Sequence, residues 1–362
     1  MSDDFFNDDE LYDDEDLFDM EGFVWQEATT VEWKKLYDAA DELYSLAPWD
    51  IFCEIDIAEI NLKDEEETYF CTITGMYDDR FGVGVYKGPS GLVSISNYIN
   101  AIEVPWYIAE NKKNCLECIW TSRNMLRKRD MTRLKSCEKT YRGKSAWPHF
   151  RKYETGFEPW YLNQSEVRVL SEVLHQLACA IKELIDAEMI NDITDGDRIK
   201  RSYDKETGTY KNEMLKPIDR IEAVAEGCVI TDELLIRRLK KKPQNGMTLE
   251  FDLPYLPLPL NGMHEERPFH PRFCMLCNTD SMEIETQYFV DLHEDPRDIA
   301  LSIIIDYVES KGRPAAIYVR DTETFSIIGH LCKSIDVDIF LVPALPMLDD
   351  FMQDIVDTML EK

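Results

Sequence analysis

The chain has 362 residues, of which 44% are apolar and 31% charged, and its formal net charge is −31. This length predicts two or three domains, and the acidity argues against non-specific nucleic-acid binding by the whole surface. No basic segment followed by an apolar run stands near residue 1, so we expect no secretory signal, and no run of roughly 18 apolar residues of the kind that spans a membrane occurs. We therefore expect a cytoplasmic protein whose ten cysteines are reduced.

Residues 1–22 contain eleven acids and no base. Three acidic-aromatic units, DDFF (Asp3–Phe6), DELY (Asp9–Tyr12) and EDLF (Glu15–Phe18), start six residues apart. Such a composition predicts a disordered acidic tail. The tail either keeps the protein soluble or acts as a multivalent docking peptide, in cis or on a basic partner.

Residues 23–190 read as an α+β N-terminal domain. A capping box formed by Thr29 and Glu32 opens a helix over 31–46, and Asn163 and Glu166 open a second, long helix. Hydrophobic periodicity predicts the remaining elements in chain order: strands at 51–57, 68–76, 81–87 and 115–121, a helix at 92–102, and a basic helix near 122–136.

Residues 123–152 form a basic segment, with eleven bases against the acids Asp130 and Glu138. Aromatic residues are interleaved with these bases, as they are in surfaces that bind phosphates and stack on bases. In the alternative, purely structural interpretation, the basic side chains cover a helix face and the aromatic side chains belong to the core. His149, within the segment, is either an acid/base group or simply packed. The ligand-binding residues that we predict are Arg142, Lys144, Trp147, Arg151 and Trp160, with the cations at the rim of an aromatic wall.

Residues 191–246 are predicted to connect the two domains through a polar loop or hairpin and a short helix capped by Thr231. Residues 247–362 follow as an α/β C-terminal domain. Its expected elements are strands at 247–253, 271–278 and 283–292, a helix at 296–310, a strand at 315–319, a helix at 322–334, a strand at 337–342 and a helix at 347–360.

This β-β-β-α-β-α-β-α order resembles that of ribonuclease H-like domains. The resemblance implies a Mg²⁺-dependent nuclease in which carboxylates from the strands and helices hold the metal. Asp252, Asp321 and Asp350 would then be catalytic, with Asp306 or Glu309 on the first helix and Asp354 as an alternative on the last. In so acidic a chain, carboxylates fall at such positions by chance, so a non-catalytic domain of similar order is the favoured reading.

Two C-x-x-C pairs, Cys115/Cys118 and Cys274/Cys277, raise the question of zinc, with His264 and His270 near the second pair. Both pairs fall in predicted strands, where residues three apart point to opposite faces. We therefore favour core cysteines and predict no bound metal.

Two groups of motifs together resemble uncharacterised bacterial proteins, mostly from Gram-positive species, that pair two domains of unknown function. The first group runs through Trp33, Pro48-Trp49, the stretch 81–88, Y-R-G-K at 141–144, W-P-x-F-R at 147–151 and Pro159-Trp160. The second is G-R-P-x-x-I-x-V-R-D at 312–321. The resemblance implies a bacterial cytoplasmic protein and no particular activity.

Our leading interpretation is a binding or regulatory protein without a cofactor. Segment 123–152 would bind a protein or nucleic acid, and the acidic tail would compete for it or dock elsewhere. The alternative is the Mg²⁺-dependent nuclease.

Overall fold

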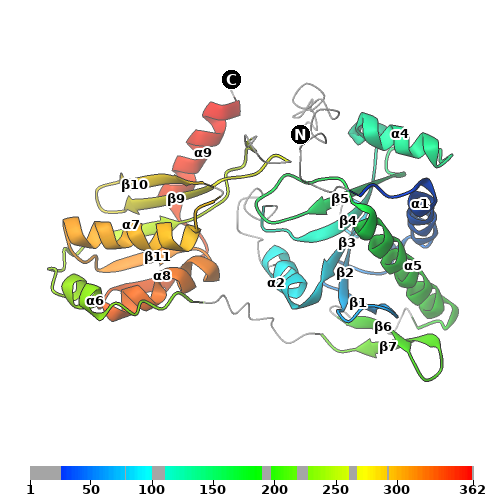
Figure 1. Cartoon of the computed structure of the whole chain (residues 1–362), viewed down its shortest axis with the longest axis horizontal. Helices are drawn as coiled ribbons and strands as arrows, with labels where there is room; N and C mark the ends of the chain where they lie inside the picture. Colours follow the sequence, from blue (N-terminus) through cyan, green and yellow to red (C-terminus); the bar gives the residue numbers. More distant parts are fainter. Residues whose placement is uncertain are drawn as a thin grey trace.

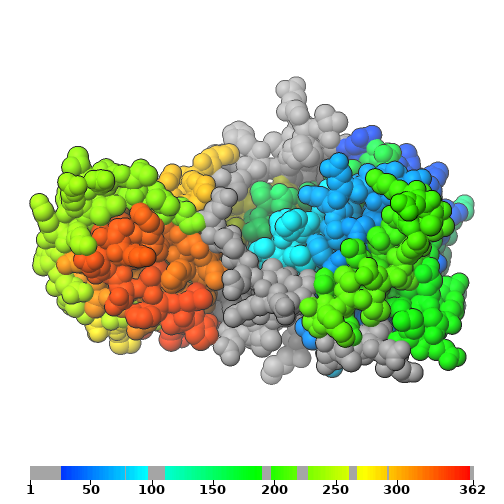
Figure 2. Space-filling model, turned by 90° about the horizontal axis from the view of Figure 1, so that it is seen from below, coloured from blue at the N-terminus to red at the C-terminus, as the bar shows by residue number. Residues whose placement is uncertain are grey.

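The computed structural model describes residues 26–77, 79–99, 111–189, 197–217, 227–260, 267–291 and 293–360, and every structural statement below concerns these residues. The acidic tail 1–22 and His264 lie outside them. The described residues form two lobes that lie side by side (Figures 1 and 2). Within these residues, no helix has the length and apolar character that a membrane crossing requires.

The N-terminal lobe is built on a seven-stranded sheet with the order β5-β4-β3-β2-β1-β6-β7. Neighbours from β1 to β5 pair antiparallel, whereas β6 runs parallel to β1. The strands are β1 (Ala58–Asn61), β2 (Tyr69–Thr74), β3 (Gly82–Lys87), β4 (Cys115–Thr121), β5 (Trp147–Tyr153), β6 (Arg198–Asp204) and β7 (Thr209–Leu215).

Helices cover both faces of this sheet. The α1 (Thr30–Ser45) and α5 (Gln164–Asp186) helices pack on one face and share its large core, while α2 (Gly88–Ile99) packs on the other. Both predicted capping boxes are present, at Thr29/Glu32 and Asn163/Glu166. A single-turn η3 (Pro48–Asp50), a second one, η5 (Arg123–Met125), and α4 (Lys128–Ser136) complete the lobe.

Two sequence-based predictions in this lobe need correction. Residues 51–57 alternate in polarity but form turns, because the Asp56 carboxylate accepts a hydrogen bond from the backbone N–H of Cys53 at 2.8 Å. Such local bonds compete with a strand ladder. Strand β5 was not predicted, and it contains Pro148, a residue that is unusual within a strand. Proline is tolerated here because β5 is the edge of the sheet.

The C-terminal lobe has a five-stranded sheet with the order β10-β9-β8-β11-β12, in which β8, β11 and β12 are parallel. The predicted element order is confirmed, and so is the fold class of an α+β domain followed by an α/β domain. The elements are β8 (Thr248–Asp252), β9 (Arg272–Asn278), β10 (Glu283–Val290), α7 (Pro296–Lys311), β11 (Ala316–Val319), α8 (Thr322–Ser334), β12 (Asp338–Leu341) and α9 (Pro346–Leu360). Helices α7 and α8 bury one face of the sheet and α9 the other.

The segment 191–246 is not a free connector. Its hairpin β6–β7 extends the N-terminal sheet, and its helix α6 (Glu233–Lys240) buries Leu239 in the C-terminal core. The N-cap of α6 is Asp232, one residue later than predicted, because its carboxylate accepts the N–H groups of Leu234 and Leu235.

The lobes meet where the β8–β9 loop reaches the loop after β5. The Gly156 carbonyl accepts the N–H of His270 at 2.7 Å. Gly156 has φ +80°, and a Cβ there would lie 2.8 Å from the Tyr255 ring, so glycine permits this close approach. Lys112 and Asp321 add an ion pair between the lobes, with Nζ and Oδ2 2.6 Å apart.

Candidate anion-binding surface

The basic segment folds around Asp130 in the first turn of α4. The Asp130 carboxylate accepts the N–H of Arg127 at 3.1 Å, which satisfies a backbone donor at the start of the helix. It also accepts two hydrogen bonds from the Arg151 guanidinium, at 3.0 and 2.7 Å. Burial alone would raise the pKa of Asp130, but the charge and hydrogen bonds of Arg151 outweigh it and lower the pKa to about 2.

The prediction that Arg151 lies at an exposed rim is therefore wrong. Only 4% of it is accessible to solvent, because strand β5 directs it towards α4, where both arms of its fork are bonded to Asp130. Bidentate pairs of this kind fix geometry. Arg151 thus positions α4 on the sheet edge and is not available to a ligand.

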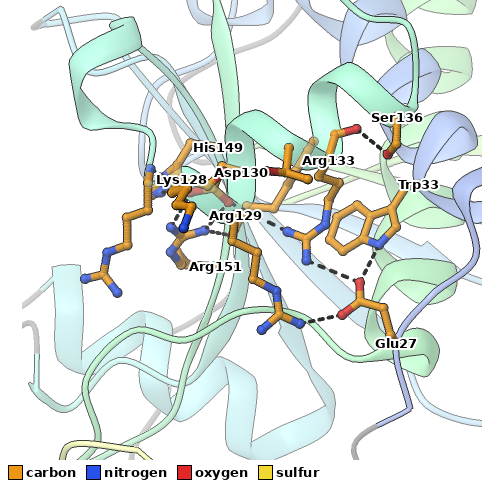
Figure 3. Close-up of polar contacts among 12 residues, drawn as sticks. Glu27, Trp33, Lys128, Arg129, Asp130, Arg133, Ser136, His149 and Arg151 are labelled. Carbon is orange, nitrogen blue, oxygen red and sulfur yellow. Dashed lines mark hydrogen bonds and ion pairs between the residues drawn. The ribbon is translucent and has the colours of Figure 1, made fainter. Parts of the chain in front are cut away.

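Glu27 is the counter-charge for the exposed side of the same cluster (Figure 3). Its carboxylate accepts hydrogen bonds from Trp33 Nε1 at 2.9 Å and Arg133 Nη2 at 3.2 Å, and it also pairs with Arg129. Burial opposes ionisation, but these arginines and the indole N–H keep the pKa of Glu27 below its usual value. This acid joins the start of the described chain to α4.

Two aromatic rings from outside the segment, Trp33 of α1 and Tyr161 of the loop before α5, lie beneath its arginines. The Arg133 guanidinium lies 3.8 Å from the centre of the Trp33 ring, and those of Arg129 and Arg151 lie 4.8 and 4.5 Å from the centre of the Tyr161 ring. Trp160 is also buried, so the predicted aromatic wall is largely core. Trp147 is half-buried and donates its indole N–H to the carbonyl of Gly143 at 3.2 Å.

His149 belongs to the packed interior of this cluster. Burial, followed by the nearby charge of Arg151, lowers the pKa of His149 to about 3, although Asp130 acts in the opposite direction. The ring is therefore neutral near pH 7 and does not titrate in the range that acid/base catalysis uses. The packed alternative is the one that the geometry supports.

Apart from the half-buried Arg127, whose backbone N–H is bonded to Asp130, the bases of the segment divide into two groups of five. Five have carboxylate partners: Arg129, Arg133, Lys139, Arg151 and Lys152. Five others are exposed and form no ion pair within the described part of the chain: Arg123, Lys128, Lys135, Arg142 and Lys144. Lys128 and Lys135 are seven residues apart on α4 and so share a helix face. We call these five exposed residues the basic face. Met125, which is 56% exposed, lies in η5 together with Arg123.

Two of the carboxylates proposed for a nuclease carry protein cations. Asp252 is buried and accepts a hydrogen bond from Arg320 Nε at 2.6 Å, while Asp321 pairs with Lys112. Asp350 is exposed on α9, and its neighbour Asp349 pairs with Arg320 instead. Among the described residues, these three aspartates do not form a group whose ligand atoms converge on one ion.

The C-x-x-C pairs lie in strands, as expected, and contribute to different cores. Cys115 and Cys118 of β4 face opposite sides of the sheet, as do Cys274 and Cys277 of β9. His270 is bonded to Glu158 and to the carbonyl of Leu256. Burial raises the pKa of the Cys277 thiol to about 11, as expected of a packed cysteine.

A pocket of about 460 Å³ opens beside the basic segment, at the end of the sheet where α2 and α5 begin. It contains Lys87 and Lys152, but also Glu65, Glu67 and Glu166. Lys152 is 3.0 Å from Glu166, and Lys87 is 3.5 Å from Glu67. Because its cations are paired within the pocket, it presents no net positive charge, and the basic face is the better candidate for an anion.

Comparison with family models identifies both lobes. Residues 33–201 match a domain of unknown function, DUF7309, and residues 235–356 match another, DUF6930. The chain therefore combines two domains of unknown function. The first match ends in β6 and the second begins in α6, which agrees with the assignment of the hairpin and the helix to separate lobes.

The other comparisons add no function. No curated protein matches the sequence. A chain in the cryo-EM structure of the simian T-cell lymphotropic virus intasome in complex with PP2A regulatory subunit B56 gamma is 13% identical, with a TM-score of 0.22. That similarity covers 34% of this chain and 49% of the other, so this chain spans about half its length. At that score, the similarity carries no argument about fold.

Sequence reasoning missed the residues that organise this surface. Asp130 counted as one of two acids in a basic run, and Glu27 was not considered. One signal in the sequence could have revealed Asp130. It lies three residues after Arg127, and at this spacing an acid accepts the backbone N–H of the residue that begins a helix.

Proposed function

We propose that this protein is a docking protein whose N-terminal domain binds an acidic polypeptide segment on the basic face. The observation that carries the proposal is the division of ten of the eleven bases into two groups of five. Five are neutralised internally, whereas Arg123, Lys128, Lys135, Arg142 and Lys144 are exposed without an ion pair in the described residues. A charged, unpaired face in a protein of net charge −31 favours an anionic partner.

An acidic peptide fits this face better than a nucleic acid does. Binding of single strands relies on exposed aromatic rings for base stacking. Here Trp33, Trp160 and Tyr161 are buried, and two of them lie under arginines. The exposed Met125 side chain, in the same single turn as Arg123, instead offers an apolar contact, which suits a peptide that carries apolar residues between its acids.

The chain's own tail has the composition of such a ligand, and we propose that it competes for the basic face in cis. Glu27, a few residues after the tail, is fixed on Arg129 and Arg133. The nine residue steps from Phe18 to Glu27 span at most roughly 30 Å, whereas α4 is roughly 14 Å long. The unit Glu15–Phe18 can therefore reach any part of α4.

We also propose that the protein is cytoplasmic. All ten cysteines are free, and eight of them are buried. Such a set fits a reducing compartment.

Fluorescence anisotropy tests the partner class. The probe is a labelled peptide with the sequence of residues 1–22, compared with labelled single-stranded RNA and DNA. We expect the peptide to bind a chain lacking residues 1–22 more tightly than it binds the full chain, with affinity falling as salt is added. Tighter binding of RNA or DNA than of the peptide would show that the partner class is wrong.

Charge reversal locates the site. Lys128→Glu with Lys135→Glu is expected to weaken peptide binding about tenfold, since each exposed pair is worth about 0.2–1 kcal/mol and reversal adds repulsion. Lys205→Glu with Lys241→Glu is the matched control, because these lysines are exposed in the β6–β7 turn and after α6. If the control variant loses the same affinity for the peptide, the effect comes from the net charge of the protein and not from a site at Lys128 and Lys135.

A further inference from the structure

A second cluster of reactive side chains lies between α1 and α5 of the N-terminal lobe, on elements that the basic face does not use. His175 and Cys179 are four residues apart on α5 and therefore lie on one face of that helix. Glu42 of α1 faces them, and the three ligand atoms lie within 4.8 Å of one another. Helices α1 and α5 lie side by side at the edge of the molecule in Figure 1.

We propose that His175 and Cys179 bind a thiophilic divalent cation, Zn²⁺, with Glu42 as the group that orients the histidine. The inference is independent of the proposed docking function.

The distances fit this arrangement. Cys179 Sγ lies 3.8 Å from His175 Nε2. A tetrahedral zinc with Zn–S near 2.3 Å and Zn–N near 2.0 Å separates these two ligand atoms by about 3.5 Å. The cation therefore needs only a small side-chain adjustment to contact both.

Glu42 does not contact the metal in this arrangement but holds the ligating histidine in place. Its Oε2 lies 3.0 Å from His175 Nδ1, so that nitrogen donates to the carboxylate while Nε2 carries the lone pair. A carboxylate behind the ligating imidazole is the usual partner of a zinc-bound histidine, because it fixes the tautomer and strengthens the ligand. The bond to α1 also ties the site to two helices.

The surroundings favour a cation and access to it. Eight of the ten cysteines are buried, whereas Cys179 and Cys228 are partly exposed. The side chains of His175 and Glu42 are about half exposed, so water can complete the coordination. The metal displaces the proton of a thiol that binds it, so Cys179 can serve as a ligand without being ionised beforehand.

Cobalt titration of the full chain tests the site. The protein is stripped with a chelator, kept reduced and titrated with Co²⁺, and the thiolate-to-cobalt charge-transfer band is followed. We expect a band that saturates at one equivalent and is abolished by Zn²⁺. It should disappear in Cys179→Ser and persist in Cys228→Ser, the matched control with a second accessible thiol. A band retained in Cys179→Ser, or absent from the unmodified chain, would overturn the proposal.

The remaining variants separate ligands from the orienting group. His175→Gln is expected to lose the band or to require at least tenfold more metal. Glu42→Gln should keep the band with a 10- to 100-fold weaker affinity, as expected of an outer partner. Zn²⁺ should raise the Tm of the unmodified chain by an amount on the order of 5 °C at a 100-fold excess over Kd, and leave that of Cys179→Ser unchanged. Equal shifts in both would indicate metal bound to surface carboxylates alone and would reject the site.

Discussion

Each lobe buries one aspartate against one arginine, and the two pairs behave differently. In the N-terminal lobe, Asp130 and Arg151 form a bidentate pair, and the pKa of Asp130 falls to about 2. In the C-terminal lobe, Asp252 and Arg320 are also in contact, at 2.6 Å, yet the pKa of Asp252 is raised. The contact alone does not decide the protonation of a buried acid.

The pKa values of Asp130 and Asp252 differ because the arginine beside each aspartate has different further partners. Among the described carboxylates, Arg151 pairs only with Asp130, although its Nη1 also donates to the Phe150 carbonyl. Arg133 and the N–H of Arg127 add to the positive potential at Asp130. Arg320 divides its charge between Asp252 and Asp349, while burial and the nearby Asp321 disfavour ionised Asp252. The N-terminal cluster thus has surplus cations, some of them on its surface, and the C-terminal cluster has surplus acids.

Breaking the pairs should give the largest effects. Arg151→Met keeps an unbranched apolar stem but leaves ionised Asp130 buried without its two hydrogen bonds from Arg151. We expect a loss of about 3–5 kcal/mol in the free energy of unfolding, measured by urea denaturation at pH 7. Arg320→Met should cost less, because Asp252 takes up a proton more readily than Asp130 does.

The exposed Arg142 provides the control for this comparison. Arg142→Met removes the same charge from the basic face and should change stability by no more than about 0.5 kcal/mol. Equal losses for Arg151→Met and Arg320→Met would contradict the idea that sharing of the arginine sets the cost.

The pH dependence of stability should have opposite signs at the two aspartates. The folded-state pKa of Asp130 is lowered, so its contribution is present above pH 4 and is lost as the pH falls towards 2. A shift of this size is worth about 2 kcal/mol. The folded-state pKa of Asp252 is raised, so folding gains from its protonation at low pH and loses that gain as the pH rises above about 4.

Asparagine variants isolate the two contributions from the background of other acids. The difference in unfolding free energy between the unmodified chain and Asp130→Asn should grow from pH 2 to pH 4. For Asp252→Asn, the difference should shift in the opposite direction as the pH rises past 4. Differences that run in the same direction for both variants would show that the pair environments are alike.

Much of the fold was readable from the sequence, because it follows from local patterns. The capping boxes at Thr29 and Asn163 and the alternation of strands and helices after Thr248 are signals within a few residues. The failures at 51–57 and β5 have a different origin. There, one side-chain bond from Asp56 and the edge position of a strand that begins Trp147-Pro148 decide the structure, and neither can be read from periodicity.

The candidate site was only partly predictable for the same reason. A run of eleven bases was evident, but which bases are exposed depends on distant acids. Glu27 lies more than a hundred residues from Arg129 and Arg133, and Asp130 is 21 residues from Arg151. Spacing along the chain places Lys128 and Lys135 on one face, yet it cannot show that Arg151 points inward.

The smallest expected effect concerns Asp321, which combines two roles at the junction of the lobes. Its carboxylate caps α8 by accepting the N–H of Thr324 at 2.7 Å, and it also pairs with Lys112 of the other lobe. Burial would raise the pKa of Asp321, but Lys112 outweighs burial and lowers it to about 2. Asp321→Asn retains a capping group and removes only the charge. We therefore expect a loss of about 1 kcal/mol in the free energy of unfolding, seen by calorimetry as weaker coupling between the unfolding of the two lobes.

Asp232→Asn is the matched control, because Asp232 caps α6 and forms no ion pair in the described residues. If both substitutions leave the coupling unchanged, Lys112 and Asp321 do not hold the lobes together. If Asp321→Asn alone separates the transitions, the aspartate suggested as a metal ligand is instead a contact that joins the two domains.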